Sequence, residues 1–213
     1  MSLYRALRSV LPLSLAEVVH VGEPIVLESF KDGGSAEPWN VVTDERVGGS
    51  SNAAARVSAE AGLVFSGTIG TPAVLPNGSE LRPFCAVRRS TYSPTVQVDL
   101  GLYESLEMRV RGDGRRYTFN LKPESANPDD LYQGVLAPPA GKWVTIGMPI
   151  SSLMLSRRGK PQVRRSLDGS VAMESVGFLL ANDDEPGSFR LDVAGIRILP
   201  FGMKPGGAGR SGA

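Results

Sequence analysis

Two runs of alternating apolar and polar residues, joined by a Gly-Asp-Gly turn, constrain the fold of this chain more than any other feature. Residues 105–111 (SLEMRVR) and 117–122 (YTFNLK) each place an apolar side chain at every second position. A period of two gives a strand one buried and one solvent-facing surface. Gly and Asp tolerate the positive φ angles of tight connections, so Gly112–Gly114 marks the turn. The pattern predicts a β-hairpin inside an all-β domain.

Ten further segments have the composition of short strands separated by turns. A dozen such strands imply two packed sheets. Residues 150–155 are the one weak candidate for a helix inside the domain. The predicted strands are 25–30, 39–43, 55–59, 63–69, 84–88, 95–100, 105–111, 117–121, 131–136, 143–148, 176–181 and 189–198.

Length and charge narrow the class of protein. A chain of 213 residues with 41% hydrophobic residues is long enough for one sandwich-sized domain with a packed core. Its formal net charge is +1, which offers a phosphate backbone little general attraction. Nucleic acid is therefore not an expected partner.

The supply of catalytic and metal-binding residues is small. The chain has one cysteine, Cys85, in an apolar run that favours packing, and one histidine, His20, outside the predicted domain. A disulfide or a thiolate cluster would need more cysteines, and a Ser-His-Asp triad would have to draw on a histidine outside the predicted domain. We therefore predict a protein that is not an enzyme and that carries no metal or cofactor.

The ends differ in composition from the centre. Residues 1–24 carry Arg5 and Arg8 on a segment with apolar positions suited to one face of a short helix. This is typical of a mitochondrial targeting segment and equally of an arm that docks on a partner. Residues 201–213 are Gly-rich, as in a flexible tail. No apolar run approaches the roughly 20 residues needed to span a bilayer. We expect one domain over residues 25–200.

An ordered set of segments in this domain resembles the complex I intermediate-associated protein 30 family. The resemblance extends over about residues 25–200. The segments are WNVVTD (39–44), VGGSS (47–51), FSG (65–67), FCAVR (84–88), RVRGDGRRY (109–117), Trp143 and Gly177-Phe178.

The resemblance implies a two-sheet jelly-roll sandwich of the galactose-binding-like type, similar to certain carbohydrate-binding modules. It implies a scaffold that helps to assemble mitochondrial respiratory complex I, or remains bound to it, through contacts with its subunits or assembly intermediates. The expected location is the matrix side of the inner membrane, peripherally. The alternatives are a carbohydrate-binding module and a plastid assembly protein with the same domain.

The matched segments supply the first group of candidate binding residues. Asp44 precedes a Gly-Gly-Ser-Ser loop that either holds its own shape through an Asx-type turn or presents an anion-binding concavity. We expect Gly49→Val to damage the fold if the loop needs a positive φ there. The candidates are Trp39, Asp44, Gly48, Gly49, Ser51, Arg88, Arg111, Asp113 and Trp143.

Two kinds of side chain in this group have alternative roles. Arg88 follows an apolar strand, and we expect it to pair with Asp44 or with Asp113 in the turn. Trp39 and Trp143 open their strands, where an indole either packs in the core or forms a platform for a sugar ring.

A basic strip supplies the second group. The segment 156–166 (SRRGKPQVRRS) contains no acidic residue, so it would suit an acidic partner or anionic lipid headgroups, or form a solvated loop. The candidate partner-binding residues are Arg157, Arg158, Lys160, Arg164 and Arg165.

Overall fold

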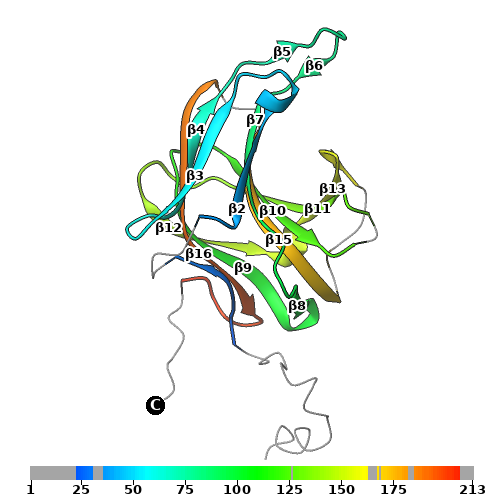
Figure 1. The fold of residues 1–213 in the computed structure, drawn as a ribbon. Coiled ribbons are helices and arrows are strands. Elements are labelled where there is room, and N and C mark those ends of the chain that lie inside the picture. Colours follow the sequence, from blue (N-terminus) through cyan, green and yellow to red (C-terminus); the bar gives the residue numbers. More distant parts are fainter. Residues whose placement is uncertain are drawn as a thin grey trace, which may run out of the picture.

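The computed structural model describes residues 23–30, 36–125, 127–162, 167, 169–181 and 185–206, and in these ranges the protein is built from strands (Figure 1). The strands are β1 (Ile25–Ser29), β2 (Trp39–Thr43), β3 (Asn52–Ser58), β4 (Gly62–Ile69), β5 (Ala73–Val74), β6 (Glu80–Leu81), β7 (Phe84–Arg89), β8 (Val96–Asp99), β9 (Tyr103–Arg111), β10 (Tyr117–Pro123), β11 (Asp130–Leu136), β12 (Trp143–Pro149), β13 (Met154–Arg157), β14 (Lys160–Pro161), β15 (Ser170–Ala181) and β16 (Gly187–Pro200). Three short 3-10 turns, η2 (Asp44–Val47), η3 (Leu100–Leu102) and η4 (Ile150–Ser152), interrupt them.

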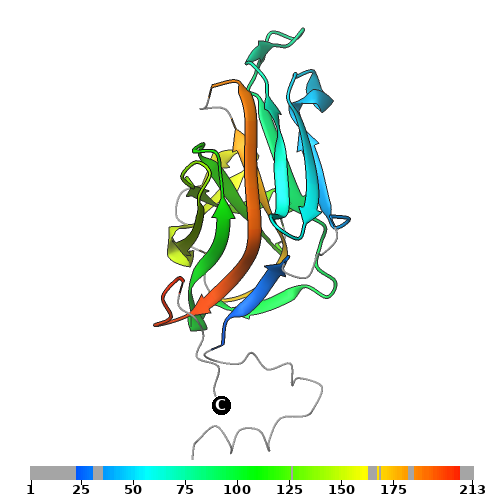
Figure 2. The same cartoon turned by 90° about the vertical axis from the view of Figure 1, so that its left-hand side faces the viewer.

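Two antiparallel sheets pack face to face. The six-stranded sheet has the order β12-β9-β16-β4-β3, with β1 also paired to β16. The eight-stranded sheet has the order β14-β13-β11-β10-β15-β7-β2, with β8 also paired to β15. Figure 2 shows β16 running the length of the molecule through the middle of the six-stranded sheet. The small β5–β6 hairpin projects from one end of the sandwich (Figure 1).

A single hydrophobic core lies between the sheets. Its largest fully buried side chains come from both layers, for example Phe65 of β4 and Phe178 of β15. Edge-to-face ring contacts join Phe119 to Phe178 within one sheet and Phe65 to Phe189 within the other, at centroid distances of 5.7 and 4.9 Å. The alternating burial of β10 is the predicted period of two. The prediction of a two-sheet, all-β sandwich is confirmed.

The predicted hairpin at residues 105–121 is wrong. β9 pairs with β12 and β16 in the six-stranded sheet, whereas β10 pairs with β11 and β15 in the eight-stranded sheet. The Gly112–Gly114 segment therefore carries the chain from one layer to the other. An alternating strand has one apolar face whichever sheet it joins, so its sequence does not reveal its neighbour.

The weak helix prediction at residues 150–155 is also wrong, because a 3-10 turn at Ile150–Ser152 is followed by β13. Four short strands were not predicted: β5, β6, β13 and β14. Residues 1–22 and 207–213, and with them most of the predicted arm and tail, lie outside the described residues.

Candidate functional site

The loop after β2 is organised by one buried carboxylate, that of Asp44. Asp44 Oδ1 accepts the backbone N–H of Ser51 at 2.9 Å, and Oδ2 accepts the Ser51 hydroxyl at 2.6 Å and the backbone N–H of Phe84 at 2.9 Å. The Ser51 hydroxyl oxygen in turn accepts the N–H of Gly70 at 2.8 Å. The side chain thus connects η2 to the starts of β3 and β7, and these amide groups are occupied by the protein's own carboxylate.

Glycine stands at positions 48 and 49 of this loop for two different structural reasons. Gly48 has φ +94°, the left-handed conformation that favours glycine. Gly49 does not have a positive φ; a Cβ placed there would lie 2.2 Å from Asp44 Oδ1. The expectation that Gly49 needs a positive φ is therefore wrong. Position 49 requires a glycine because the Asp44 side chain approaches too closely for a Cβ.

Arg88 pairs with neither of the carboxylates predicted for it. It lies on the exposed outer face of β7, whereas Cys85 and Val87 point into the core. The neighbouring Arg89 instead forms an ion pair with Glu28 of β1 and lies 4.1 Å from the ring centroid of Tyr92. Strand alternation separates adjacent arginines onto opposite faces, and the inward one has the partner.

The two tryptophans occupy different environments. Trp39 is 6% exposed and packs on Phe30, with ring centroids 6.0 Å apart. Trp143 lies on the outer side of the six-stranded sheet, beneath the guanidinium groups of Arg109 and Arg111 at 5.8 and 5.0 Å. Trp39 is therefore a core residue, whereas Trp143 is half-buried and has two arginines as its ring contacts.

Arg111 also connects two central strands of the six-stranded sheet. Its guanidinium donates to Asp192 Oδ2 of β16 at 2.6 and 2.8 Å, and Arg190 donates to Asp192 Oδ1 at 2.8 Å. Asp192 is 1% exposed. A buried carboxylate held by two arginines fixes the outer face of the sheet.

Asp113 fastens the crossing between the sheets. Its carboxylate accepts the Tyr117 hydroxyl at 3.0 Å, the Arg115 N–H at 3.0 Å and the N–H of Arg190 of β16 at 2.8 Å. Burial first, and then the charge of Asp113 and the hydrogen bond to it, raise the pKa of the Tyr117 phenol. The Gly-Asp-Gly segment thus has a structural task in joining the two layers.

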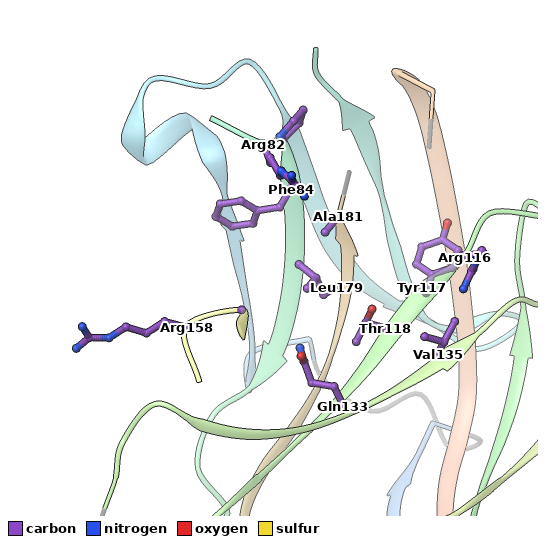
Figure 3. Close-up of a pocket in the computed structure, with 12 residues that line it drawn as sticks. Arg82, Phe84, Arg116, Tyr117, Thr118, Gln133, Val135, Arg158, Leu179 and Ala181 are labelled. Carbon is purple, nitrogen blue, oxygen red and sulfur yellow. The ribbon is translucent and has the colours of Figure 1, made fainter. Parts of the chain in front are cut away.

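A cleft of about 740 Å³ lies on the outer face of the eight-stranded sheet (Figure 3). Its floor includes side chains that the strand register places side by side, since Thr118 of β10 lies opposite both Val135 of β11 and Leu179 of β15. Of the residues that the structure describes, twelve line the cleft, and these include three arginines and no acidic residue: Arg82, Pro83, Phe84, Arg116, Tyr117, Thr118, Gln133, Val135, Arg158, Gly159, Leu179 and Ala181.

The arginines of this cleft differ in how they are engaged. Arg158 forms an ion pair with Asp129 at 2.7 Å, and its side chain extends away from the other labelled residues in Figure 3. Arg82 and Arg116 are exposed, and within the described part of the chain neither takes part in a hydrogen bond or an ion pair. Figure 3 places Arg82 and Arg116 on either side of Leu179 and Ala181. The cleft therefore combines an apolar floor with free positive charge.

The residues of the basic strip have different roles in the structure. Arg157 pairs with the buried Asp130 at 2.5 Å, so its charge is used in the fold. Arg158 lies at the cleft, and Lys160 is exposed in β14. Arg164 and Arg165 lie outside the described residues.

Sequence reasoning did not single out Arg82, Arg116 or the apolar floor. Arg116 stands immediately before β10 and Arg82 stands two positions before β7. The two arginines are more than 30 positions apart along the chain. Only the pairing order of the strands brings them to one face, and that order has no local sequence signal.

Comparison with protein families matches residues 28–193 to the family model described as "Complex I intermediate-associated protein 30 (CIA30)". The chain belongs to this family. The match runs from the end of β1 through the first half of β16 and contains every strand between them. It includes the Asp44 loop, the Asp113 crossing and the arginine-lined cleft.

Two relatives carry the family name in full, "Complex I intermediate-associated protein 30, mitochondrial". The protein of Drosophila melanogaster is 29% identical over 198 residues, which are 86% of this chain and 66% of the fly protein. The protein of Mus musculus is 23% identical over 188 residues, 82% of this chain and 56% of the mouse protein. The CIA30-family chain thus spans somewhat less than two thirds of the length of these relatives.

Among solved structures, the chain is similar to the family 11 carbohydrate-binding module of the cellulosomal cellulase Lic26A-Cel5E of Clostridium thermocellum. The TM-score is 0.54 at 17% identity, over 84% of this chain and 95% of that module. This similarity shows a shared fold and confirms the jelly-roll sandwich expected from the sequence.

Proposed function

We propose that this CIA30-family protein is a non-enzymatic scaffold in the assembly of mitochondrial respiratory complex I. It acts by binding subunits or assembly intermediates, and it does so on the matrix side of the inner membrane, peripherally. The observation that carries the proposal is the family match over residues 28–193, together with two relatives whose names include the word mitochondrial. Residues 25–200 are the binding domain, flanked by an arm (1–24) and a tail (201–213).

The use of the acidic and thiol groups supports a role in binding. Asp44, Asp113 and Asp192 are all engaged by hydrogen-bond donors of the protein itself. Burial and the nearby Asp44 charge raise the pKa of the Cys85 thiol to about 12, so the thiol stays protonated near neutral pH. These groups hold the sandwich together, so binding of a partner falls to exposed side chains, such as Arg82 and Arg116 of the cleft.

The described residues contain no helix with the length and apolar character of a membrane span. Under the proposal, attachment to the inner membrane comes through the bound partners, whose interface would bury on the order of 1,200 to 2,000 Å².

The test is blue-native complexome profiling of mitochondria from cells that express the full protein with a small tag. We expect the protein to migrate with partial complex I intermediates if it is released after assembly, or with mature complex I if it is retained. Migration alone or with unrelated complexes would contradict the proposal, and so would fractionation of the protein with plastids. A strain lacking the protein should accumulate less complex I, and restoring the chain should reverse the loss.

A further inference from the structure

The cleft on the eight-stranded sheet has the chemistry of a binding site for a particular kind of chain. Val135 is 57% exposed on its floor, and Phe84 and Leu179 are half-buried beside it. Arg82 and Arg116 stand at its margins, exposed and without an ion-pair or hydrogen-bond partner among the described residues. A ligand that covers the floor must be apolar there, and one that reaches the margins gains charge-assisted hydrogen bonds if it carries carboxylates.

We infer that this cleft binds an extended acidic segment of a partner protein, in which apolar residues lie between two carboxylates. The inference rests on the proposed function, since it names the part of a partner that the scaffold would hold. The charge complementarity with Arg82 and Arg116 selects this occupant. The planar guanidinium group favours carboxylates because it binds them through two parallel N–H donors.

The strand order sets the spacing of the acidic residues. Arg82 precedes β7 and Arg116 precedes β10, and β15 lies between these two strands. Two strand spacings are about 10 Å, which an extended chain crosses with about three residues. The segment therefore carries acidic residues at positions i and i+3, with the two apolar residues between them over Leu179 and Ala181 of β15. Val135 of β11 lies on the other side of β10, next to the carboxylate that meets Arg116.

The segment would cross the strands and not extend the sheet. The side chains of the floor come from four neighbouring strands, β7, β15, β10 and β11, whose backbone groups are already paired inside the sheet. Recognition is therefore by side chains, and affinity depends on charge and on the apolar floor. We expect binding to weaken as salt is raised, because both arginines are exposed to solvent.

The experiment uses the full chain and a fluorescein-labelled peptide, Gly-Ser-Glu-Leu-Val-Glu-Ser-Gly, measured by fluorescence anisotropy at low and at raised salt. The matched probe has both glutamates replaced by glutamine. We expect saturable binding of the acidic peptide and at least five-fold weaker binding of the glutamine peptide, as for the loss of about 1 kcal/mol or more.

Matched variants locate the site. Arg82→Glu and Arg116→Glu should each weaken binding about five-fold or more, whereas Arg56→Glu, an exposed arginine on β3 of the other sheet, should leave it unchanged. Val135→Glu places a negative charge on the floor and should weaken binding, while Val26→Glu, 59% exposed on β1, should not. Circular dichroism and the urea midpoint check that each variant is folded.

The inference is overturned if no saturable binding occurs up to about 1 mM peptide. A Kd of about 1 mM corresponds to a binding free energy of only about −4 kcal/mol. The inference is equally overturned if both peptides bind alike, if the arginine reversals leave binding unchanged, or if cellotetraose or anionic vesicles displace the acidic peptide. Complexome profiling of the Arg82→Glu, Arg116→Glu double variant separates this inference from the proposed function. Unchanged co-migration with complex I leaves the assembly role standing and removes the cleft from it.

Discussion

At the scale of single residues, Asp44 joins segments that are far apart in the sequence. Its carboxylate is fully buried and accepts hydrogen bonds from Ser51 and Phe84. Ser51 directly precedes β3, and Phe84 is the first residue of β7. A small apolar side chain in place of Asp44 would leave three donors without an acceptor in a dry environment. Each such loss is costly because the donor has also given up its contact with water.

We therefore expect Asp44→Ala to lower the free energy of unfolding by about 3 kcal/mol, from several unsatisfied buried groups. Urea denaturation followed by circular dichroism measures the change. The control is Asp99→Ala. The Asp99 carboxylate is half-buried and accepts one backbone N–H, from Gly101 at 3.0 Å. Its loss should lower the free energy of unfolding by about 1 kcal/mol or less. Equal losses in the two variants would show that Asp44 has no special role.

At the scale of elements, the sequence located the strands better than it paired them. The predicted strand 39–43 is the observed β2, and the other predicted strands fall within a few residues of observed ones. Pairing failed at Gly112–Gly114, because alternation reveals which side chains are buried and not which sheet buries them. Two-residue strands such as β5 and β6 are too short to show a period.

The candidate site divides in the same way. Local chemistry marked Asp44 and its Gly-Gly-Ser-Ser loop, since a short carboxylate before such a loop favours side-chain to backbone hydrogen bonds. The cleft arises instead from long-range strand order. Arg82 and Arg116 are far apart along the chain, and only folding brings them to one face.

The crossing between the sheets makes a prediction about alkaline pH. The pKa of the Tyr117 phenol is raised in the folded state by burial and by Asp113, whereas in the unfolded chain it titrates near pH 10. Its contribution to stability is thus fully present below about pH 10 and is lost as pH rises above it, by about 1.4 kcal/mol per pH unit. Urea titrations at several pH values from 9 to 11 measure this slope.

Tyr117→Phe removes the titrating group, so we expect the loss of stability above about pH 10 to be less steep than in the parent chain. The buried phenol of Tyr92, whose pKa is raised by burial and by Glu28, would continue to contribute. A slope that is the same with and without the Tyr117 hydroxyl would show that the crossing is not sensitive to pH.

At the scale of the whole molecule, one core joins both sheets, and each sheet carries one of the two tryptophans. Trp39 opens β2 in the eight-stranded sheet and Trp143 opens β12 in the six-stranded sheet. Because neither layer can hide its apolar face without the other, we expect them to unfold together.

Single-tryptophan variants test this cooperativity. In Trp39→Phe only the six-stranded sheet carries a tryptophan, and in Trp143→Phe only the eight-stranded sheet does. Within each variant, the urea midpoint from tryptophan fluorescence should coincide with that from far-ultraviolet circular dichroism. Separate midpoints in either variant would mean that the layers unfold independently.

The position of the last two strands has a consequence for how the protein is made. β15 pairs with β10, β7 and β8, and β16 pairs with β9, β4 and β1, so the interior of each sheet comes from the final part of the sandwich. A polypeptide that emerges from a ribosome or a translocation pore N-terminus first lacks β15 until about residue 181 has emerged and lacks β16 until about residue 200 has emerged. The earlier strands can form pairs such as β3–β4 and β10–β11, but β15 and β16 are needed to join such pairs into the two sheets. A chain truncated before β16 lacks the centre of the six-stranded sheet. The sandwich can therefore complete its folding only after the whole domain has emerged. Until then its strands expose unpaired edges and apolar surface, which holding chaperones bind.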